Sequence, residues 1–165
     1  MWAILKVDIN NLNYLEKDFK KKLGNEINIY SPKLIIQKYK KNKLTSKEFT
    51  LLGDYIFCFH KEFENSSMIN SLKFSRGLKY FLCGFKQSQK EIQQFIQKCK
   101  ESEDKNGYLT VNFFKIYSNS LYKFSTGPFA DTIFKIISLQ KSKINILLGN
   151  IKTTICKKRF LFTPL

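Results

Sequence analysis

Apolar residues in the first sixty positions recur with two different periods, which predict strands in some segments and helices in others. Trp2–Val7 and Gly53–His60 are short apolar runs bounded by polar residues, and both predict buried strands. Across Leu12–Leu23 the apolar residues recur at helical spacing. Asn10 or Asn11 is the expected N-cap of that helix, because a short polar side chain can accept the free backbone N–H groups of the first turn.

The segments that follow continue the alternation of strands and helices. Ile27–Tyr39 has extended character, and the polar segment Lys40–Glu48 predicts a loop. We expect a short helix over Asn65–Phe74, a strand over Leu78–Phe85 and a third helix, opened by a capping box, over Ser88–Cys99. The resulting order, βαββαβ with one further helix, is an α+β arrangement of the ferredoxin-like type, an antiparallel sheet with helices on one face.

A change of composition at Glu101–Gly107, first acidic and then flexible, marks the expected domain boundary. The first domain is expected over residues 1–104, a partly ordered linker over 105–120 and a second domain over 121–165. Within the linker, the aromatic and β-branched residues of Tyr108–Tyr117 favour an ordered strand. In the second domain, a Gly-Asn pair between two alternating apolar runs predicts a hairpin, and several such short strands predict a small β-barrel.

The stretch Phe124–Asp131, FSTGPFAD, forms a rigid corner between two runs of aliphatic residues. Pro128 has a fixed φ and no N–H, and Gly127 can adopt backbone angles that other residues cannot. Such a corner reverses the chain. Phe129 at its tip is then either packed inward or available to a partner.

The formal charge of +16, with an isoelectric point near 9.7, predicts attraction to a polyanion such as DNA, RNA, an RNA-rich particle or an anionic membrane. An AT-rich genome is an alternative explanation, since it favours lysine codons in every protein. Arginine occurs only at positions 76 and 159, which fits that alternative. Charge alone therefore does not choose the partner.

Few residues in the chain are suited to metal binding or catalysis. The four cysteines have no CxxC spacing and His60 is the only histidine, so we expect no zinc site, other metal or cofactor. There is no G-x-S-x-G motif, paired carboxylate or phosphate-binding glycine loop, which predicts a binding protein and not an enzyme. No signal peptide or apolar run of bilayer length is present, so we expect a cytoplasmic protein with reduced thiols and no membrane contact.

The motifs, taken in order, resemble those of NusG-type transcription elongation factors. The opening Trp2, the strands GDYIFCF and KYFLCGF, and the corner GPFAD before a barrel strand carry the resemblance. Residues 2–104 resemble the family's polymerase-binding domain and residues 121–165 its KOW domain. The resemblance implies that the first domain binds the clamp helices of RNA polymerase through an apolar groove, to which Tyr55, Phe57 and Phe81 contribute. The alternative for these three residues is an ordinary place in the core.

The resemblance also implies contact with non-template or upstream DNA, for which the chain offers cationic residues along the first expected helix, the following loop and a later turn. A solvated charged face is the alternative. The candidate nucleic-acid-binding residues are Lys17, Lys20, Lys21, Lys22, Lys41, Lys43 and Arg76.

In the second domain, the resemblance places Phe129, Leu148 and Gly149 where the family contacts Rho or a small-subunit ribosomal protein. Eight cationic residues stand there against the single carboxylate of Asp131. Phe134 occupies the position of the KOW glycine, as in specialised RfaH-type paralogues. Those paralogues can hold this domain as an autoinhibitory helical hairpin, a minority alternative here that the Gly149-Asn150 hairpin signal opposes.

The expected function is that of a monomeric elongation factor that suppresses pausing or termination and links polymerase to a ribosome or a termination factor, more in the manner of a specialised antiterminator. Two alternatives remain: a housekeeping NusG that acts in Rho-dependent termination, and a KOW-type RNA- or ribosome-binding protein that does not act on polymerase.

Overall fold

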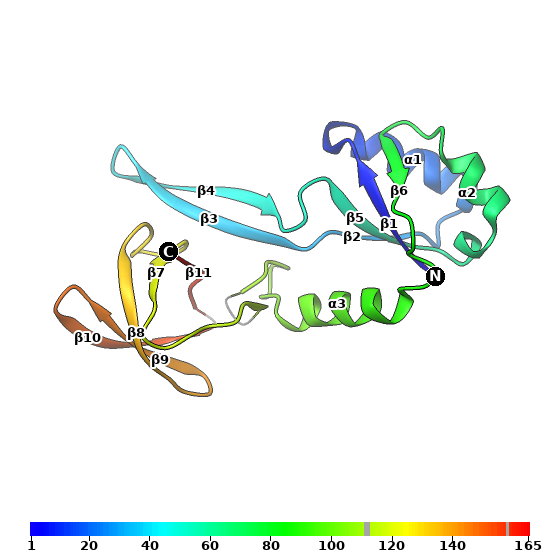
Figure 1. Cartoon of the computed structure of the whole chain (residues 1–165). Helices are drawn as coiled ribbons and strands as arrows, with labels where there is room; N and C mark the ends of the chain where they lie inside the picture. Colours follow the sequence, from blue (N-terminus) through cyan, green and yellow to red (C-terminus); the bar gives the residue numbers. More distant parts are fainter. Residues whose placement is uncertain (111–112, 158) are drawn as a thin grey trace. The chain divides into compact units, whose positions relative to one another are not determined.

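The computed structural model describes residues 1–110, 113–157 and 159–165, and it is a mixed α+β structure with several antiparallel sheets (Figure 1). The chain divides into two compact units. The first comprises Met1–Ser31 and Thr50–Gln97, and the second comprises Pro32–Phe49 and Lys98–Leu165. Positions 111 and 112 of the expected linker strand, and Lys158, lie outside the described residues. Within the described part, no helix is both long and apolar enough to cross a membrane.

The first unit is built on a four-stranded antiparallel sheet. Its strands are β1 (Trp2–Val7), β2 (Asn28–Tyr30), β5 (Tyr55–Phe59) and β6 (Leu78–Phe81), in the order β2-β5-β1-β6. The two strands predicted from apolar runs, β1 and β5, are confirmed and lie at the centre of the sheet. In each of these strands, alternate side chains are buried on one face of the sheet, and the other face is partly covered. Burial on both faces is what a central strand requires.

Three α-helices, α1 (Leu12–Leu23), α2 (Ser66–Leu72) and α3 (Gln89–Glu101), and two short 3-10 turns, η1 (Ile9–Asn11) and η2 (Lys61–Glu64), complete this part of the chain. Asn11 occupies the N-cap of α1 but makes no capping hydrogen bond with its side chain. Asp8 does so instead for the preceding turn η1, because its carboxylate accepts from the N–H of Asn10 at 3.1 Å.

The two helices of the expected βαββαβ order, α1 and α2, lie on one face of the sheet, and the further helix α3 lies on the other face (Figure 1). Phe81 pairs with Leu5 of β1 and contacts Phe19 of α1, with ring centroids 6.5 Å apart. Phe57 pairs with the neighbouring Ile4, and therefore points to the opposite face, where it contacts Phe95 of α3 at 5.7 Å.

The side chain of Gln89 fixes the start of α3 to the edge of the core. Its Oε1 accepts from the N–H of Trp2 at 2.9 Å and its Nε2 donates to the carbonyl of Trp2 at 2.7 Å. The ring of Trp2 lies edge-on to Phe59, with centroids 5.3 Å apart. These contacts hold the first residues of β1 in place next to α3.

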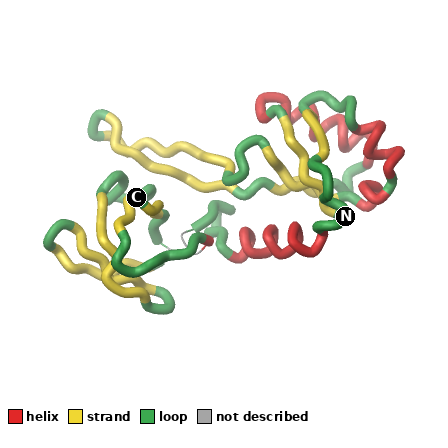
Figure 2. Tube along the Cα trace, in the orientation of Figure 1, coloured by secondary structure: helices red, strands yellow, loops and turns green. Residues whose placement is uncertain are grey.

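The second unit contains a hairpin of two long strands, β3 (Lys33–Lys40) and β4 (Lys43–Thr50), joined by a two-residue turn (Figure 2). The expected loop over Lys40–Glu48 is therefore wrong. Nearly every residue of β4 is exposed, so its sequence carries no apolar alternation to indicate a strand. The turn residues Lys41 and Asn42 both have positive φ, 49° and 58°, as tight hairpin turns require.

Most of the second unit after the hairpin is a five-stranded antiparallel sheet, and the described residues of 121–165 form strands and turns and not the helical hairpin of the minority alternative. The predicted hairpin at Gly149-Asn150 is confirmed, since Leu148 and Ile151 pair directly across it. The strands are β7 (Leu121–Phe124), β8 (Ile133–Leu139), β9 (Lys143–Leu148), β10 (Ile151–Cys156) and β11 (Phe162–Pro164), in the order β10-β9-β8-β7-β11.

An aromatic cluster forms the core of this sheet, and Phe134 lies at its centre. Its side chain is 1% exposed, and its ring centroid lies 4.2 Å from that of Phe124, 5.3 Å from Phe162 and 6.1 Å from Tyr122. The large side chain at this position is therefore accommodated by packing against other rings and is not displaced to the surface.

Candidate functional site

A group of half-buried and exposed side chains lies on one face of the first sheet, where β5, β1 and β6 run side by side. Lys6 of β1 pairs with Tyr55 on one side and with Tyr80 on the other. The two tyrosine hydroxyls are 3.0 Å apart, and the ammonium group of Lys6 lies 4.5 Å from the ring centroid of Tyr55. We call Lys6, Tyr55 and Tyr80 the tyrosine patch.

The hydrogen bond within the tyrosine patch changes the acidity of both phenols. When Tyr80 donates, its hydroxyl stabilises the ionised form of Tyr55 and lowers the pKa of Tyr55, and the nearby ammonium group of Lys6 lowers it further. The same hydrogen bond raises the pKa of Tyr80, because Tyr80 would lose the proton that it donates to Tyr55 when it ionises. The patch therefore combines apolar ring faces with a polarised pair of hydroxyls.

Phe57 and Phe81, predicted to bind polymerase together with Tyr55, are not on this surface. Phe57 is 3% exposed, because α3 covers it through Phe95 and Tyr30 stacks on it at 6.3 Å. Phe81 points to the opposite face of the sheet and packs against the rings of the core. The expectation that these two residues are exposed anchors is wrong.

The exposed aromatic side chain next to Tyr55 is that of Tyr80, which the sequence analysis did not name as a candidate. Its side chain is 45% exposed on the edge strand β6. Alternation along β6 gives it the face opposite to Phe81, and this was the signal available from the sequence. Which of the two faces is left open depends on where α3 packs, and the packing of a distant helix cannot be read from the sequence of β6.

A second candidate surface combines the outer side of α1 with the turn that precedes β6. Lys17, Lys20 and Lys21 are exposed along the helix. Lys22 is tied to α2 and the turn, where its Nζ donates to the carbonyl of Ser71 at 3.0 Å and to the hydroxyl of Ser75 at 3.3 Å. The other three predicted lysines of this helix are therefore exposed and available for phosphate groups.

Arg76, another of the predicted nucleic-acid-binding residues, lies next to the same helix. Its guanidinium lies 3.8 Å from the ring centroid of Tyr14, a cation–π contact, and its N–H donates to the carboxylate of Asp18 at 3.2 Å. The next residue, Gly77, makes this approach possible: its φ is +88°, and a Cβ there would stand 2.7 Å from the carbonyl oxygen of Asn11.

Phe74 lies in the same turn as Arg76, between Lys73 and Arg76 in the sequence, and the sequence analysis assigned it only to the helix. Its side chain is 91% exposed, the largest value among the exposed large hydrophobic residues described. An aromatic ring free in solvent among cations is the arrangement on which nucleic-acid bases stack. Phe74, Arg76 and Tyr14, with the lysines of α1, form what we call the stacking surface.

The other two predicted nucleic-acid-binding residues, Lys41 and Lys43, are exposed at the tip of the β3–β4 hairpin and belong to the second unit. At the base of the hairpin, Glu48 accepts from Lys33 at 2.9 Å and from the hydroxyl of Tyr108 at 3.0 Å. The hydrogen bond from Lys33, and then that from Tyr108, lower the pKa of the Glu48 carboxyl.

The Gly-Pro-Phe corner is the loop between β7 and β8, and it closes on the aromatic core of the second unit. Gly127 has φ +84°, and a Cβ there would stand 2.6 Å from the ring of Phe160, so only glycine fits this turn without displacement. Phe129 is 42% exposed, with its ring 5.8 Å from Phe124 and 6.3 Å from Phe160. It is therefore half packed and half accessible.

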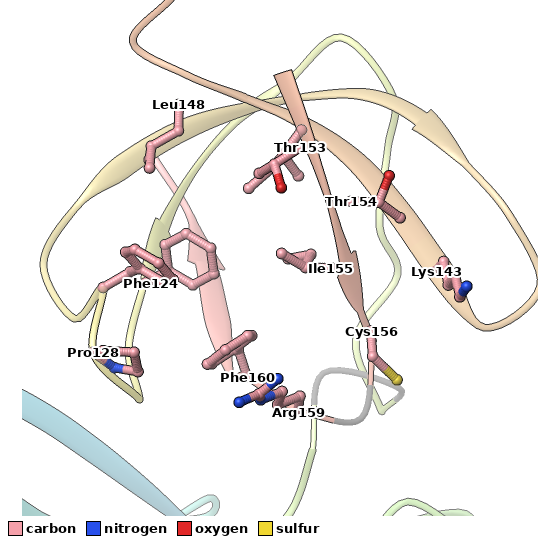
Figure 3. Close-up of a pocket in the computed structure, with 12 residues that line it drawn as sticks. Phe124, Pro128, Lys143, Leu148, Thr153, Thr154, Ile155, Cys156, Arg159 and Phe160 are labelled. Carbon is pink, nitrogen blue, oxygen red and sulfur yellow. The ribbon is translucent and has the colours of Figure 1, made fainter. Parts of the chain in front are cut away.

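Phe129 and Leu148 border a common pocket of about 600 Å³ in this sheet (Figure 3). Gly149, the third predicted residue, has φ +57° in the turn that follows and does not line the pocket. We call this cavity the barrel pocket. The residues lining it are Phe124, Pro128, Phe129, Lys143, Ile146, Leu148, Thr153, Thr154, Ile155, Cys156, Arg159 and Phe160.

The described residues include no group of three or more histidine, cysteine or carboxylate side chains that could hold a metal ion. Among the cysteines, Cys58 and Cys99 are buried, and Cys83 and Cys156 are exposed. Burial raises the pKa of the Cys58 thiol, with a smaller contribution from Glu16, which keeps it protonated and unreactive.

No protein-family model matches the chain, and no curated protein does. Among solved structures, the MjSpt4:Spt5 complex in its conformation B is similar with 12% identity over 100% of this chain and 98% of that one, at a TM-score of 0.31. NusG of Thermotoga maritima is similar with 12% identity over 94% of this chain and 91% of that one, also at 0.31. Likeness at this level says nothing about function, so the surfaces of the chain itself must carry the conclusion.

Proposed function

We propose that the chain is a NusG-like transcription elongation factor that binds RNA polymerase through the tyrosine patch. The observation that carries the proposal is the contact between Lys6, Tyr55 and Tyr80 on the first sheet, in which Tyr80 is exposed and Lys6 and Tyr55 are half-buried. The protein acts in the cytoplasm as a monomer, by binding alone, without a cofactor. Its second unit contacts a further partner, so that two large assemblies are held at a high effective concentration.

The placement of the motifs supports this proposal. GDYIFCF contains the central strand β5, KYFLCGF contains the edge strand β6, and GPFAD lies in the β7–β8 loop. The order β2-β5-β1-β6, with antiparallel neighbours, is the order that a ferredoxin-like βαββαβ domain requires. The five short antiparallel strands β7–β11 of the second unit are compatible with a small barrel of the KOW type.

The chemistry of the tyrosine patch suits the clamp helices of polymerase. Tyrosine rings give a large apolar contact area at a small cost in side-chain entropy, and the hydroxyl pair can bond polar groups at the edge of a helix. An amphipathic helix, or a pair of them, can lie against such a surface with apolar side chains on the rings. Lys6 adds a positive charge that favours an acidic helix face.

Capture of purified RNA polymerase by the immobilised full chain tests the proposal. The variant with both Tyr55→Ala and Tyr80→Ala should weaken binding by at least about tenfold, since each buried aromatic contact in an interface is worth about 2 kcal/mol or more. Tyr117→Ala is the control, because Tyr117 is an exposed tyrosine of the second unit, at 62% against 45% for Tyr80. Unchanged capture by the double variant refutes the assignment. If the wild-type chain captures no polymerase, the alternative of an RNA- or ribosome-binding protein is favoured.

We further propose that the stacking surface contacts non-template or upstream DNA, because it presents an exposed ring among cations. Phe74→Ala should weaken binding of a single-stranded oligonucleotide by about 1–3 kcal/mol and leave duplex binding unchanged. Lys17→Gln should reduce the slope of log affinity against log salt by about 0.7–0.9 if the lysine neutralises one phosphate. Equal affinities of wild type and Phe74→Ala for single strands contradict stacking.

A specialised antiterminator is favoured over a housekeeping factor, because Phe134 stands where a KOW motif has glycine and is built into the aromatic core. Binding of the full chain to purified Rho and to small ribosomal subunits separates the two. If the chain is a specialised antiterminator, it should bind the small ribosomal subunit and not Rho. Binding to Rho alone favours the housekeeping alternative.

A further inference from the structure

We infer that the outer edge of β10 pairs with the same edge of a second copy of the chain, so that two terminal sheets join across a two-fold axis. The inference goes beyond the proposed function, because it concerns the chain when it is free of other partners. The monomer that acts on polymerase is then in equilibrium with a dimer. Three features of β10 carry the inference: its open backbone groups, its lack of protection, and a register in which its own residues match.

The backbone of β10 is open on the side away from β9. Among the described strands, β10 pairs only with β9 and lies at the margin of the sheet (Figure 1). In the same register, the N–H of Lys157 donates to the carbonyl of Ser142 at 3.0 Å. Bonded and non-bonded pairs alternate in an antiparallel ladder, so the odd-numbered residues of β10 bond to β9. The N–H and C=O groups of Lys152 and Thr154 therefore point outward, and no described residue bonds them there.

The edge of β10 lacks the protection that the other outer strands have. Outer strands in monomers are usually very short, highly charged, or interrupted by proline or a bulge. The opposite edge of this sheet, β11, has three residues and ends at Pro164, and the outer strands of the first sheet have three and four residues. Strands β3 and β4 each carry three charged residues. β10 has six residues, a single charge at Lys152, and an unshifted register with β9.

The sequence of β10, IKTTIC, can pair with itself in antiparallel orientation about Thr153. With Thr153 opposite its own copy, Lys152 lies opposite Thr154 of the second copy. Such a pair exchanges both of its hydrogen bonds, so each open N–H and C=O of these two residues finds a partner. An axis at Thr154 is less suitable, because it would pair Lys152 with Cys156, whose carbonyl already accepts from the N–H of Arg159 at 3.1 Å.

The side chains also match in this register. Ile151 is 67% exposed, and pairing places it opposite Ile155 of the second copy, where it is covered. Thr153 lies opposite Thr153, a pair that can bond through its hydroxyls. Lys152 lies opposite a threonine and not opposite a second lysine, so like charges are not directly opposed. Matching of a surface to itself is what a two-fold interface requires.

The size and charge of the interface predict how the dimer responds to conditions. A single pair of strands buries less area than the roughly 1,200–2,000 Å² of a stable interface, so the dimer should be weak and reversible. Each chain carries a formal charge of +16, and the two chains repel each other. Added salt screens that repulsion, so it should strengthen the dimer.

Sedimentation equilibrium of the nuclease-treated full chain tests the inference, from low micromolar to the highest soluble concentration and at low and high salt. We expect a monomer–dimer equilibrium that moves toward the dimer in high salt. A monomer under all these conditions overturns the inference. A dimer that is lost in high salt indicates two chains bridged by a residual polyanion, and this result overturns it as well.

Lys152→Pro tests which edge is used. Proline removes an outward N–H and no bond to β9, so an edge strand can accept it. The loss of two hydrogen bonds in the dimer, with the proline rings at the junction, should weaken association at least about tenfold. Lys152→Gln is the matched control: it removes the same charge, keeps the N–H and should dimerise at least as well as the wild type. An equally strong dimer in Lys152→Pro, with an unchanged circular dichroism spectrum, overturns the inference.

A charge exchange at the two-fold axis tests the register. Thr153→Lys and Thr153→Glu should each weaken the dimer, because each places like charges opposite one another. An equal mixture of the two variants should dimerise at least about tenfold more strongly than either alone, since lysine then lies opposite glutamate. Thr163→Lys and Thr163→Glu are the controls on the opposite edge strand β11 and should show no such gain. A mixture that associates no better than its components overturns the inference.

The dimer and polymerase binding are measured separately. The variant with both Tyr55→Ala and Tyr80→Ala should dimerise as the wild type does, because both changes lie in the first unit. A chain that captures polymerase but never dimerises refutes this inference alone. A chain that dimerises through β10 but captures no polymerase supports it and refutes the proposed function.

Discussion

Replacing Phe134 by glycine should destabilise the second unit. The side chain of Phe134 is 1% exposed, and three aromatic rings surround it within 6.1 Å. Truncating a buried phenylalanine to alanine costs about 3–5 kcal/mol, and a glycine in a strand interior costs about 0.5–1 kcal/mol more. We therefore expect Phe134→Gly to cost about 4–6 kcal/mol.

A loss of that size is comparable to the whole stability of a small domain, which is about 5 kcal/mol at the low end. Amide hydrogen exchange in β8 and β9 measures it, with the amides of β1 and β5 as a reference within the same molecule. Protection should fall about a thousandfold, or to that of an unfolded segment. Phe134→Leu, which keeps most of the apolar volume, should cost less.

The matched control is Ile133→Gly, the neighbouring residue of β8, whose side chain is 50% exposed. It introduces the same backbone freedom without opening a cavity, so it should cost only about 1 kcal/mol. If Phe134→Gly costs no more than Ile133→Gly, the aromatic cluster does not hold this sheet together and the reasoning is refuted.

Three further predictions follow from single contacts. Gly127→Ala should lower the stability of the second unit by about 1–3 kcal/mol in urea unfolding, because the new Cβ meets the ring behind it, whereas Gly24→Ala, with open space around it, should cost less. The pKa of Glu48 is lowered in the folded state, so its contribution to the stability of the hairpin base is present above the pKa of the unfolded chain and is lost as the pH falls through the folded pKa. An NMR titration of the Glu48 carboxyl group should show the lowered pKa, and an unshifted titration contradicts it. Tyr80→Phe should raise the pKa of Tyr55, read from tyrosinate absorbance on alkaline titration, and an unchanged titration means that the two hydroxyls are not bonded.

Elements with a strong apolar period were predictable from the sequence. β1 and β5 are buried runs, and the hairpin between β9 and β10 has a Gly-Asn turn that permits one register only. The β3–β4 hairpin was missed because its strands are stabilised by backbone pairing and side-chain contacts such as that of Lys33 with Glu48, and not by burial. Its turn residue Lys41 is an unusual choice for positive φ, so local sequence gave little warning.

The candidate site was predictable only in part, and the limit has a physical cause. Alternation along β5 shows that Tyr55 and Phe57 share a face. That face is partly open at Tyr55 and is covered by α3 at Phe57. Phe74 was missed for the opposite reason, since an apolar residue after a helix is expected to pack and here it does not. Both cases depend on contacts between segments distant in sequence.

The edge-on pair of Trp2 and Phe59 has a practical consequence. Trp2 is the sole tryptophan of the chain, and it lies in the first unit between β5 and the start of α3. Intrinsic indole emission therefore reports on one half of the molecule and is silent about the other. Melting curves recorded by that signal would miss the unfolding of the terminal sheet. A tryptophan introduced into that sheet would be needed to follow the unfolding of both units.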